Sequence, residues 1–236
     1  MKIVIYIYNG ITMLDAIGPY EVFKKVNGLD IQFVSKEKGV IEADSHLVSI
    51  NSKFGIDDVN DADILLIPGS AIAFVREMKD ERVLKWITKM DQTTHKTVSV
   101  CTGSIILAAT GLLEGKRATS HWKPLELLSM YGAIPTRERI VEEGKFITAA
   151  GVSAGIDVAI YLVSLLKGAT VAKAAQLAIE YDPQPPFHSG NYLTAEEDVI
   201  KLAEENMERE AKQELTLWEM IKNVGVLMQL TKPGKR

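Results

Sequence analysis

The sequence predicts a three-layer α/β sandwich in which a mostly parallel sheet is covered by helices on both faces. Three observations support this fold class. Short apolar runs bounded by turn residues alternate along the chain with longer segments of helical periodicity. Hydrophobic residues make up 47% of the 236 residues, which is enough for one sizeable core. An apolar run also turns sharply into a helical segment at Cys101, the only cysteine.

The first half of the chain is expected to alternate strands and helices. The Asn9-Gly10 turn ends the first strand, and the next helix is expected to begin near Pro19 because proline suits a first helical turn. In chain order the expected elements are a strand at 3–8, a helix within 14–26, a strand at 31–35, an extended excursion at 41–50, a core strand at 63–69 and a helix at 81–90.

The second half continues the pattern and adds helices at its end. Gly168 separates two helices, and a proline-rich link at 182–186 precedes the last helical stretch. The expected elements are a helix at 105–110, a short strand at 117–120, a helix at 123–131, paired extended runs at 139–142 and 145–149 that extend the sheet, helices at 152–166 and 171–180, and a helical stretch at 195–224.

Composition narrows the class of protein. One domain is expected over residues 1–230, followed by a loose tail at 231–236. The net charge of −4, with acids and bases interspersed, gives no electrostatic footprint for nucleic acid or an anionic membrane. A single cysteine excludes an intramolecular disulfide and fits a reducing cytoplasm. The start of the chain lacks the pattern of a signal peptide, and no apolar run approaches the ~18 residues of a spanning helix.

Cys101 stands where a nucleophile is expected. A lone cysteine is usually a small buried side chain, but its position between strand and helix favours a reactive role. Gly103 and Ser104 follow it and leave room for backbone and substrate to approach. The first amides of a helix carry the positive end of its dipole and stabilise a thiolate, so we expect a lowered pKa for Cys101.

Three loops at the carboxyl ends of the expected strands carry chemistry, and ligands bind at this edge in open α/β sheets. They supply Asp15, Gly69 with Ser70, and Cys101. A carboxyl group near a thiol can take its proton, return it to a substrate or position water, although Asp15 could equally cap a helix. The amides of Gly69 and Ser70 could face a developing negative charge or form an ordinary turn.

His121 follows Cys101 by 20 residues and could reach the same edge as a base, or could be a packed core residue beside Trp122. The other histidines form no spaced cluster with carboxylates, so no metal site is expected. The glycines show neither a dinucleotide fingerprint nor a phosphate loop, so no cofactor is expected either.

Together these segments resemble the ThiJ/PfpI superfamily, whose fold is flavodoxin-like and similar to class I glutamine amidotransferases, with a cysteine on a nucleophile elbow. Within it the chain resembles the isonitrile hydratase branch. Asp15 stands where the chaperone, deglycase and glyoxalase-like branches carry Glu, and Thr102 stands where the PfpI proteases carry His. The segments that carry the resemblance are 15–23, 101–103, 108–115, 118–122 and 180–187.

The resemblance implies a reaction and a set of residue roles. Cys101 would attack the terminal carbon of an isonitrile, Asp15 would shuttle the proton, and water would hydrolyse the thioimidate to an N-substituted formamide. Thr102 would hold Asp15 and the thiolate in place, and Gly103 belongs to the elbow. The amides near Gly69 and Ser70 would polarise water or a charged intermediate, although many relatives carry a second glycine in place of Ser70. No metal or organic cofactor is implied.

Other classes of function stay open at this stage. Relatives of this kind form the sensory half of AraC-type regulators, but the last helical stretch is acidic and no DNA-binding region follows, so we expect no nucleic-acid partner. A redox-stress role, with Cys101 oxidised, and glyoxalase-like aldehyde chemistry are the further alternatives. A small-molecule substrate is expected, and the habit of the superfamily predicts a homodimer.

Overall fold

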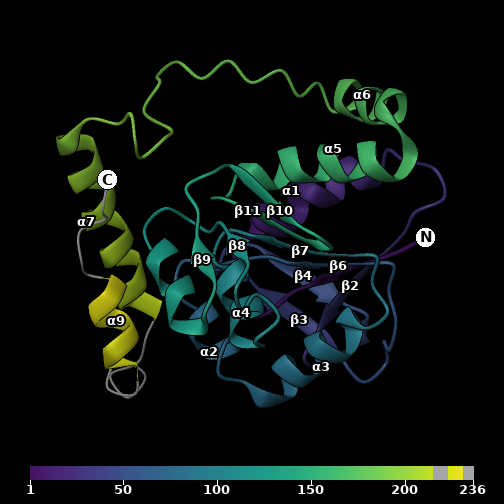
Figure 1. Ribbon diagram of the computed structural model, residues 1–236, viewed down its shortest axis with the longest axis horizontal. Coiled ribbons are helices and arrows are strands. Elements are labelled where there is room, and N and C mark those ends of the chain that lie inside the picture. The colour runs from purple at the N-terminus through teal and green to yellow at the C-terminus, as the bar shows by residue number, and fades with distance from the viewer. Residues whose placement is uncertain (215–222, 231–236) are drawn as a thin grey trace.

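The computed structural model describes residues 1–214 and 223–230. Its centre is a seven-stranded sheet (Figure 1) in the order β10-β11-β7-β6-β1-β2-β5. Every neighbouring pair is parallel except β10 and β11, which form an antiparallel hairpin at one edge. The strands are β1 (Lys2–Tyr6), β2 (Asp30–Ser35), β5 (Phe54–Gly55), β6 (Ile64–Ile67), β7 (Lys96–Val100), β10 (Ile140–Glu143) and β11 (Phe146–Ala149).

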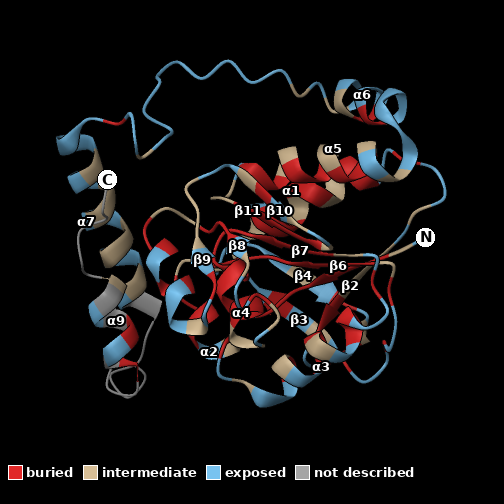
Figure 2. Ribbon diagram, viewed as in Figure 1, coloured by how far each residue is buried: buried red, intermediate tan, exposed pale blue. Residues whose placement is uncertain are grey.

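Helices cover both faces of this sheet, as the sequence predicts. Figure 1 shows α1 (Met13–Phe23), α5 (Ala154–Lys167) and α6 (Ala169–Ala178) on one face, where α5 packs against both of the others. The opposite face carries α2 (Phe74–Glu77), α3 (Glu81–Asp91) and α4 (Gly103–Ala109). Figure 2 shows the strands between the two layers as buried, and all four residues of β6 are apolar and buried. Continuous apolar runs are typical of parallel strands that are covered on both faces.

The helix α1 differs from its expected start. It begins at Met13, so Pro19 lies inside it rather than in its first turn. The proline ring packs on α5, where its Cγ and Cδ lie 3.4 Å from the position that a Cβ on Gly155 would occupy. Packing between the two helices therefore outweighs the cost of a missing backbone donor. The earlier start places Asp15 on the first turn of the helix, not in the preceding loop.

Smaller elements flank the sheet. The excursion at 41–50 is an antiparallel pair, β3 (Gly39–Glu42) with β4 (Ser49–Ser52). The expected strand at 117–120 is shorter, and as β8 (Arg117–Ala118) it pairs with β9 (Ile134–Pro135) outside the main sheet. The helix expected at 123–131 is the 3-10 helix η1 (Leu125–Tyr131).

The chain after α6 leaves the body of the molecule and returns to it. Residues 182–191 are all exposed and lack helix or strand, and Figures 1 and 2 show them as an extended trace away from the sheet. The chain then forms α7 (Glu197–Glu214) and α9 (Val224–Leu230). The middle of the expected helical stretch, 215–222, and the expected tail, 231–236, lie outside the described residues. Within the described part no helix has both the length and the apolar character that crossing a membrane requires.

Gly103 at the start of α4 gives the first test. A Cβ on this residue would lie 2.0 Å from the carbonyl oxygen of Ile67, a backbone atom at the end of β6. We expect Gly103→Ala to lower the free energy of unfolding by about 3 kcal/mol or more, because strand and helix would have to separate. The matched variant Gly190→Ala, where a Cβ meets nothing within 4 Å, should unfold in urea like the wild type. Equal stability of the two variants would contradict this close packing.

Candidate active site

Cys101 occupies a sharp turn between β7 and α4. Its φ angle is +56°, a left-handed conformation that costs a non-glycine residue about 1–3 kcal/mol. Its N–H donates to the carbonyl oxygens of Ala149 (3.0 Å) and Ala150 (2.9 Å). Its own carbonyl oxygen accepts from the hydroxyls of Ser104 (3.0 Å) and Ser120 (3.1 Å). These four hydrogen bonds hold the strained backbone in place.

The loop after β6 lies directly against this turn. A Cβ on Gly69 would lie 2.5 Å from the Thr102 nitrogen and 2.9 Å from the Cys101 Cβ. Only a glycine fits between the two loops without displacing one of them. The carboxyl ends of β6 and β7 therefore lie side by side, as the sequence predicts.

Asp15 reaches the same point from the first turn of α1 and is fully buried. Its Oδ2 accepts a hydrogen bond from the Gly69 N–H at 2.9 Å, whereas its Oδ1 has no hydrogen-bond partner among the described residues. Burial raises the pKa of Asp15 from 3.8 to about 7, and the negative charge of Asp44 adds to the rise. The Gly69 amide and the nearby Cys101 thiol oppose it only in part. The carboxyl group therefore exchanges its proton near neutral pH.

Cys101 is a neutral thiol in this environment. Burial raises its pKa well above the usual value of 9.0, and the Asp15 charge raises it further. The amide and hydroxyl of Thr102 favour the thiolate but do not compensate. The expectation of a lowered pKa is wrong, because α4 spans only seven residues and the cost of desolvating the sulfur outweighs the helix dipole.

Thr102 ties the two loops together. Its Oγ1 accepts from the Ser70 N–H at 2.8 Å and donates to the Ser70 carbonyl oxygen at 2.9 Å. The Ser70 hydroxyl in turn accepts from the Phe74 N–H at 2.7 Å at the start of α2. The amides predicted to face a negative charge are thus already engaged: that of Gly69 by Asp15 and that of Ser70 by Thr102. Here they position the acid and the elbow, and their oxyanion role stays a prediction.

His121 lies beside the site as a neutral ring. Burial lowers its pKa to about 4, and its Nδ1 accepts a hydrogen bond from the Lys123 N–H at 3.4 Å. Its Cδ2 lies 3.0 Å from the position of a Cβ on Gly151, so the ring is packed tightly. Among residues 1–214 and 223–230, no hydrogen bond joins His121 to Cys101. The residue shares a cavity with the thiol but does not contact it as a base.

Cys101 lines a cavity of about 270 Å³, together with Thr102, Ser70 and His121. Asp44 lies in its wall, where the carboxylate oxygen Oδ2 accepts from the Thr12 hydroxyl at 2.8 Å. The sequence analysis did not identify three residues near the site: Thr12, Asp44 and Ser120. Of these, only Ser120 could have been identified from the sequence, because it adjoins the candidate residue His121. No group of three or more side chains suited to binding a metal ion occurs in the described part of the chain.

The fold and the site together define a class of protein. A parallel sheet with helices on both faces, carrying a strained cysteine at the end of a central strand, is the flavodoxin-like arrangement with a nucleophile elbow. A family model described as the DJ-1/PfpI family matches residues 1–165. The chain belongs to this family, as the sequence resemblance predicts.

Three relatives illustrate the range of this similarity. A protein from Pseudomonas putida named isonitrile hydratase is 36% identical over 200 residues, covering 85% of this chain and 87% of the relative. A crystal structure of a ThiJ/PfpI family protein from Pseudomonas syringae matches with a TM-score of 0.83 and 34% identity, covering 89% of each chain. The transcriptional regulator CdhR from Pseudomonas aeruginosa is 28% identical over 144 residues, which is 59% of this chain and 40% of the regulator.

The raised pKa of Asp15 predicts a pH-dependent stability. The folded protein holds this proton more tightly than the unfolded chain does, so the stabilisation is complete below pH 4 and is lost as the pH rises through about 7. The rise in pKa from 3.8 to about 7 corresponds to about 4 kcal/mol. Asp15→Asn should not share this loss, so its stability relative to the wild type should increase between pH 4 and pH 8.

Urea unfolding at several pH values measures this difference. The control is Asp61→Asn, which removes a carboxylate with a largely exposed side chain. Its unfolding free energy should follow that of the wild type across the range. Parallel curves for the wild type and Asp15→Asn would show that Asp15 titrates alike in the folded and unfolded chains.

Proposed function

We propose that this protein catalyses the cysteine-dependent hydration of isonitriles to N-substituted formamides. The observation that carries the proposal is the buried pair of Asp15, whose pKa is raised to about 7, and Cys101, whose thiol stays protonated. Such a pair can move one proton from sulfur to a substrate carbon at neutral pH. The relative named isonitrile hydratase, which shares 36% identity over most of both chains, supports this assignment.

In the first step the thiol adds to the terminal carbon of the isonitrile. Ionised Asp15 accepts the proton as the Sγ of Cys101 forms its bond to that carbon, which activates a thiol that does not ionise by itself. The protonated carboxyl then gives the same proton to the carbon. The product is a thioimidate, in which the carbon carries one hydrogen, the sulfur and a double bond to nitrogen. The thioimidate contains all the atoms of the isonitrile and the thiol, and nothing else is released.

In the second step water hydrolyses the thioimidate. Asp15, ionised again, removes a proton from water as the oxygen attacks the carbon, and then gives this proton to the nitrogen. The tetrahedral intermediate expels the sulfur as its hydroxyl oxygen becomes a carbonyl, and the released proton returns to the thiol through Asp15. The N-substituted formamide leaves and the free thiol of Cys101 is restored. Thr102 supports both steps, since its amide favours negative charge on the sulfur.

The burial of Cys101 favours this reaction over a redox-sensing role. Only 4% of the residue is exposed, and its raised pKa leaves little thiolate for an oxidant. A ligand-binding regulator, the third class, would show saturable binding without product. Glyoxalase-like chemistry is distinguished in the same assay by replacing the isonitrile with a small aldehyde. Turnover of isonitrile alone supports the hydratase.

We also propose that the protein acts as a homodimer in the cytoplasm, on a small-molecule substrate and without nucleic acid. A single cysteine fits a reducing compartment, and this cysteine is buried and unpaired. The family habit supports the dimer. Light scattering coupled to size-exclusion chromatography tests it directly, since one copy has a mass of 26.0 kDa.

Substitutions at the pair test the reaction. Cys101→Ala should abolish formamide production from a simple alkyl isonitrile, and Asp15→Asn should lower kcat by about 10²–10⁴-fold because the proton has no carrier. Circular dichroism and urea unfolding should show that both variants fold. Formamide production by Cys101→Ala at the wild-type rate would rule out the mechanism.

The pH profile gives an independent test. Because the ionised form of Asp15 starts the reaction, kcat/KM should rise with pH and level off above an apparent pKa near 7. The residual activity of Asp15→Asn should lack this inflection between pH 5 and pH 8. If kcat/KM of the wild type does not change with pH across this range, Asp15 is not the base.

A further inference from the structure

The helix α7 covers the cavity that contains Cys101. Glu204, Met207 and Ala211 of α7 lie in the cavity wall, opposite residues of the α/β core. Figure 1 shows α7 and α9 beside the core, reached only through the extended segment after α6. We refer to the described residues 197–214 and 223–230 as the C-terminal arm. The match to the family model ends at residue 165, so the arm lies outside the part that defines the family.

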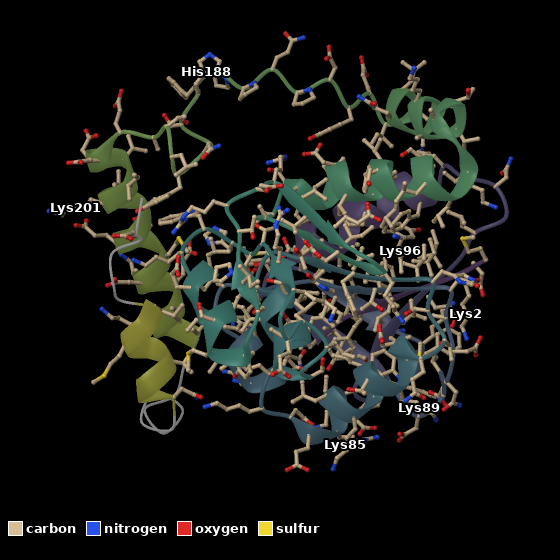
Figure 3. All side chains as sticks on the ribbon, viewed as in Figure 1. Lys2, Lys85, Lys89, Lys96, His188 and Lys201 are labelled. Carbon is tan, nitrogen blue, oxygen red and sulfur yellow. The ribbon has the colours of Figure 1, made fainter. Side chains whose placement is uncertain are left out.

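One face of α7 forms the wall. Glu204, Met207, Glu208 and Ala211 follow the i, i+3, i+4, i+7 spacing that places side chains on one side of a helix. Lys201, near the start of α7, points away from the body of the molecule in Figure 3. The exposed residues of α7 also include Leu202, which takes no part in the cavity wall. The helix therefore has a cavity face and a solvent face.

A shielded ion pair fixes this face to the core. The Nζ of Lys123 lies 2.5 Å from Oε1 of Glu204, with side-chain exposures of only 6% and 20%. Both residues line the cavity. Removing one partner would leave the other charge shielded and unpaired, so the pair specifies where α7 sits. A second contact lies at the end of the connecting segment, just before the arm, where Tyr192 stacks on Trp122 with 5.0 Å between ring centres.

Size and charge of the cavity restrict what binds in it. Its volume of about 270 Å³ lies at the lower end of small-molecule sites. The wall that faces the thiol contains apolar side chains from both the core and the arm, among them Ile72, Met207 and Ala211. Four acidic residues and one lysine also line it: Asp44, Glu204, Glu208, Glu210 and Lys123. Such a wall favours a compact, uncharged organic group and disfavours an anionic one.

We propose that the C-terminal arm determines substrate selectivity, with Met207 and Ala211 limiting the size of the organic group and Glu208 disfavouring anionic ones. The Lys123–Glu204 pair positions the arm. This inference rests on the proposed function for the identity of the reaction. It assigns the preferred substrates as isonitriles with compact, neutral, apolar substituents.

A series of isonitriles tests the size limit. Ala211→Leu should lower kcat/KM for cyclohexyl isonitrile about tenfold relative to methyl isonitrile, and Met207→Ala should raise the same ratio. Leu202→Ala, a truncation on the solvent face of the same helix, should leave the ratio unchanged. An equal ratio in the wild type, Met207→Ala and Ala211→Leu would overturn the proposal.

One matched pair of substitutions and a third substitution test the charges. Glu208→Gln should increase the use of isocyanoacetate relative to its neutral methyl ester, whereas Glu205→Gln, on the exposed side, should not. Glu204→Gln should raise KM for cyclohexyl isonitrile with little effect on kcat for methyl isonitrile, because the wall shifts and the reacting pair stays in place. If KM is unchanged in Glu204→Gln, the ion pair does not position the arm.

Mixed-disulfide formation at the single cysteine, with release of methanesulfinate from a methanethiosulfonate reagent, provides a readout independent of isonitrile chemistry. The rates at which methyl and benzyl methanethiosulfonate label Cys101, followed by mass spectrometry, should change in the same direction as the isonitrile ratios. If the labelling ratio shifts but the wild type makes no formamide, the arm controls access and the proposed reaction is wrong. If the wild type makes formamide and neither ratio shifts, the reaction stands and the role of the arm is wrong.

Discussion

The left-handed backbone at Cys101 is the constraint on which the rest of the site depends. It turns the chain within two residues, Cys101 and Thr102, from a buried strand into a helix, and it leaves the thiol at the carboxyl edge of the sheet. Two glycines, Gly69 and Gly103, allow the neighbouring loop to approach the turn closely enough for Thr102 to bridge them. The hydrogen bonds from Ser104 and Ser120 stabilise a conformation that the residue itself disfavours. The position of the Cys101 thiol therefore depends on residues whose contacts stabilise the turn.

Burial governs the chemistry of this site more than the helix dipole does. Both ionisable groups, Asp15 and Cys101, are enclosed, burial raises the pKa of each, and the Asp15 charge raises the pKa of Cys101 further. A pair of this kind resists carrying two negative charges, so at neutral pH it holds its protons close to the point of use. Ionising this buried acid costs free energy, and the same raised pKa suits the proton transfer that we propose for Asp15.

Much of the fold could be predicted from the sequence, because strand and helix periods, turn residues and the strand-to-helix turn at Cys101 are local signals. The start of α1 could not, because Pro19 is tolerated through its contact with Gly155, a partner far along the chain. The direction of the Cys101 pKa also depends on burial that no local pattern reveals. The contacts of Gly69 and Ser70 were missed for the same reason, since they depend on where Asp15 and Thr102 reach in three dimensions. The contribution of α7 to the cavity was invisible, because an amphipathic helix does not indicate which surface it will cover.

The exposed segment at 182–191 has a consequence for how the arm meets the core. Because this segment joins the two covalently, docking of α7 is an intramolecular event with an effective concentration that is typically millimolar for short linkers. A modest interface therefore suffices to keep the arm in place at any dilution of the protein; among the described residues it includes the Lys123–Glu204 ion pair and the Lys79–Asn223 hydrogen bond. Cleavage within the segment would abolish this advantage without altering a single contact. The arm would then behave as an ordinary dissociable ligand, whose occupancy falls as the protein is diluted.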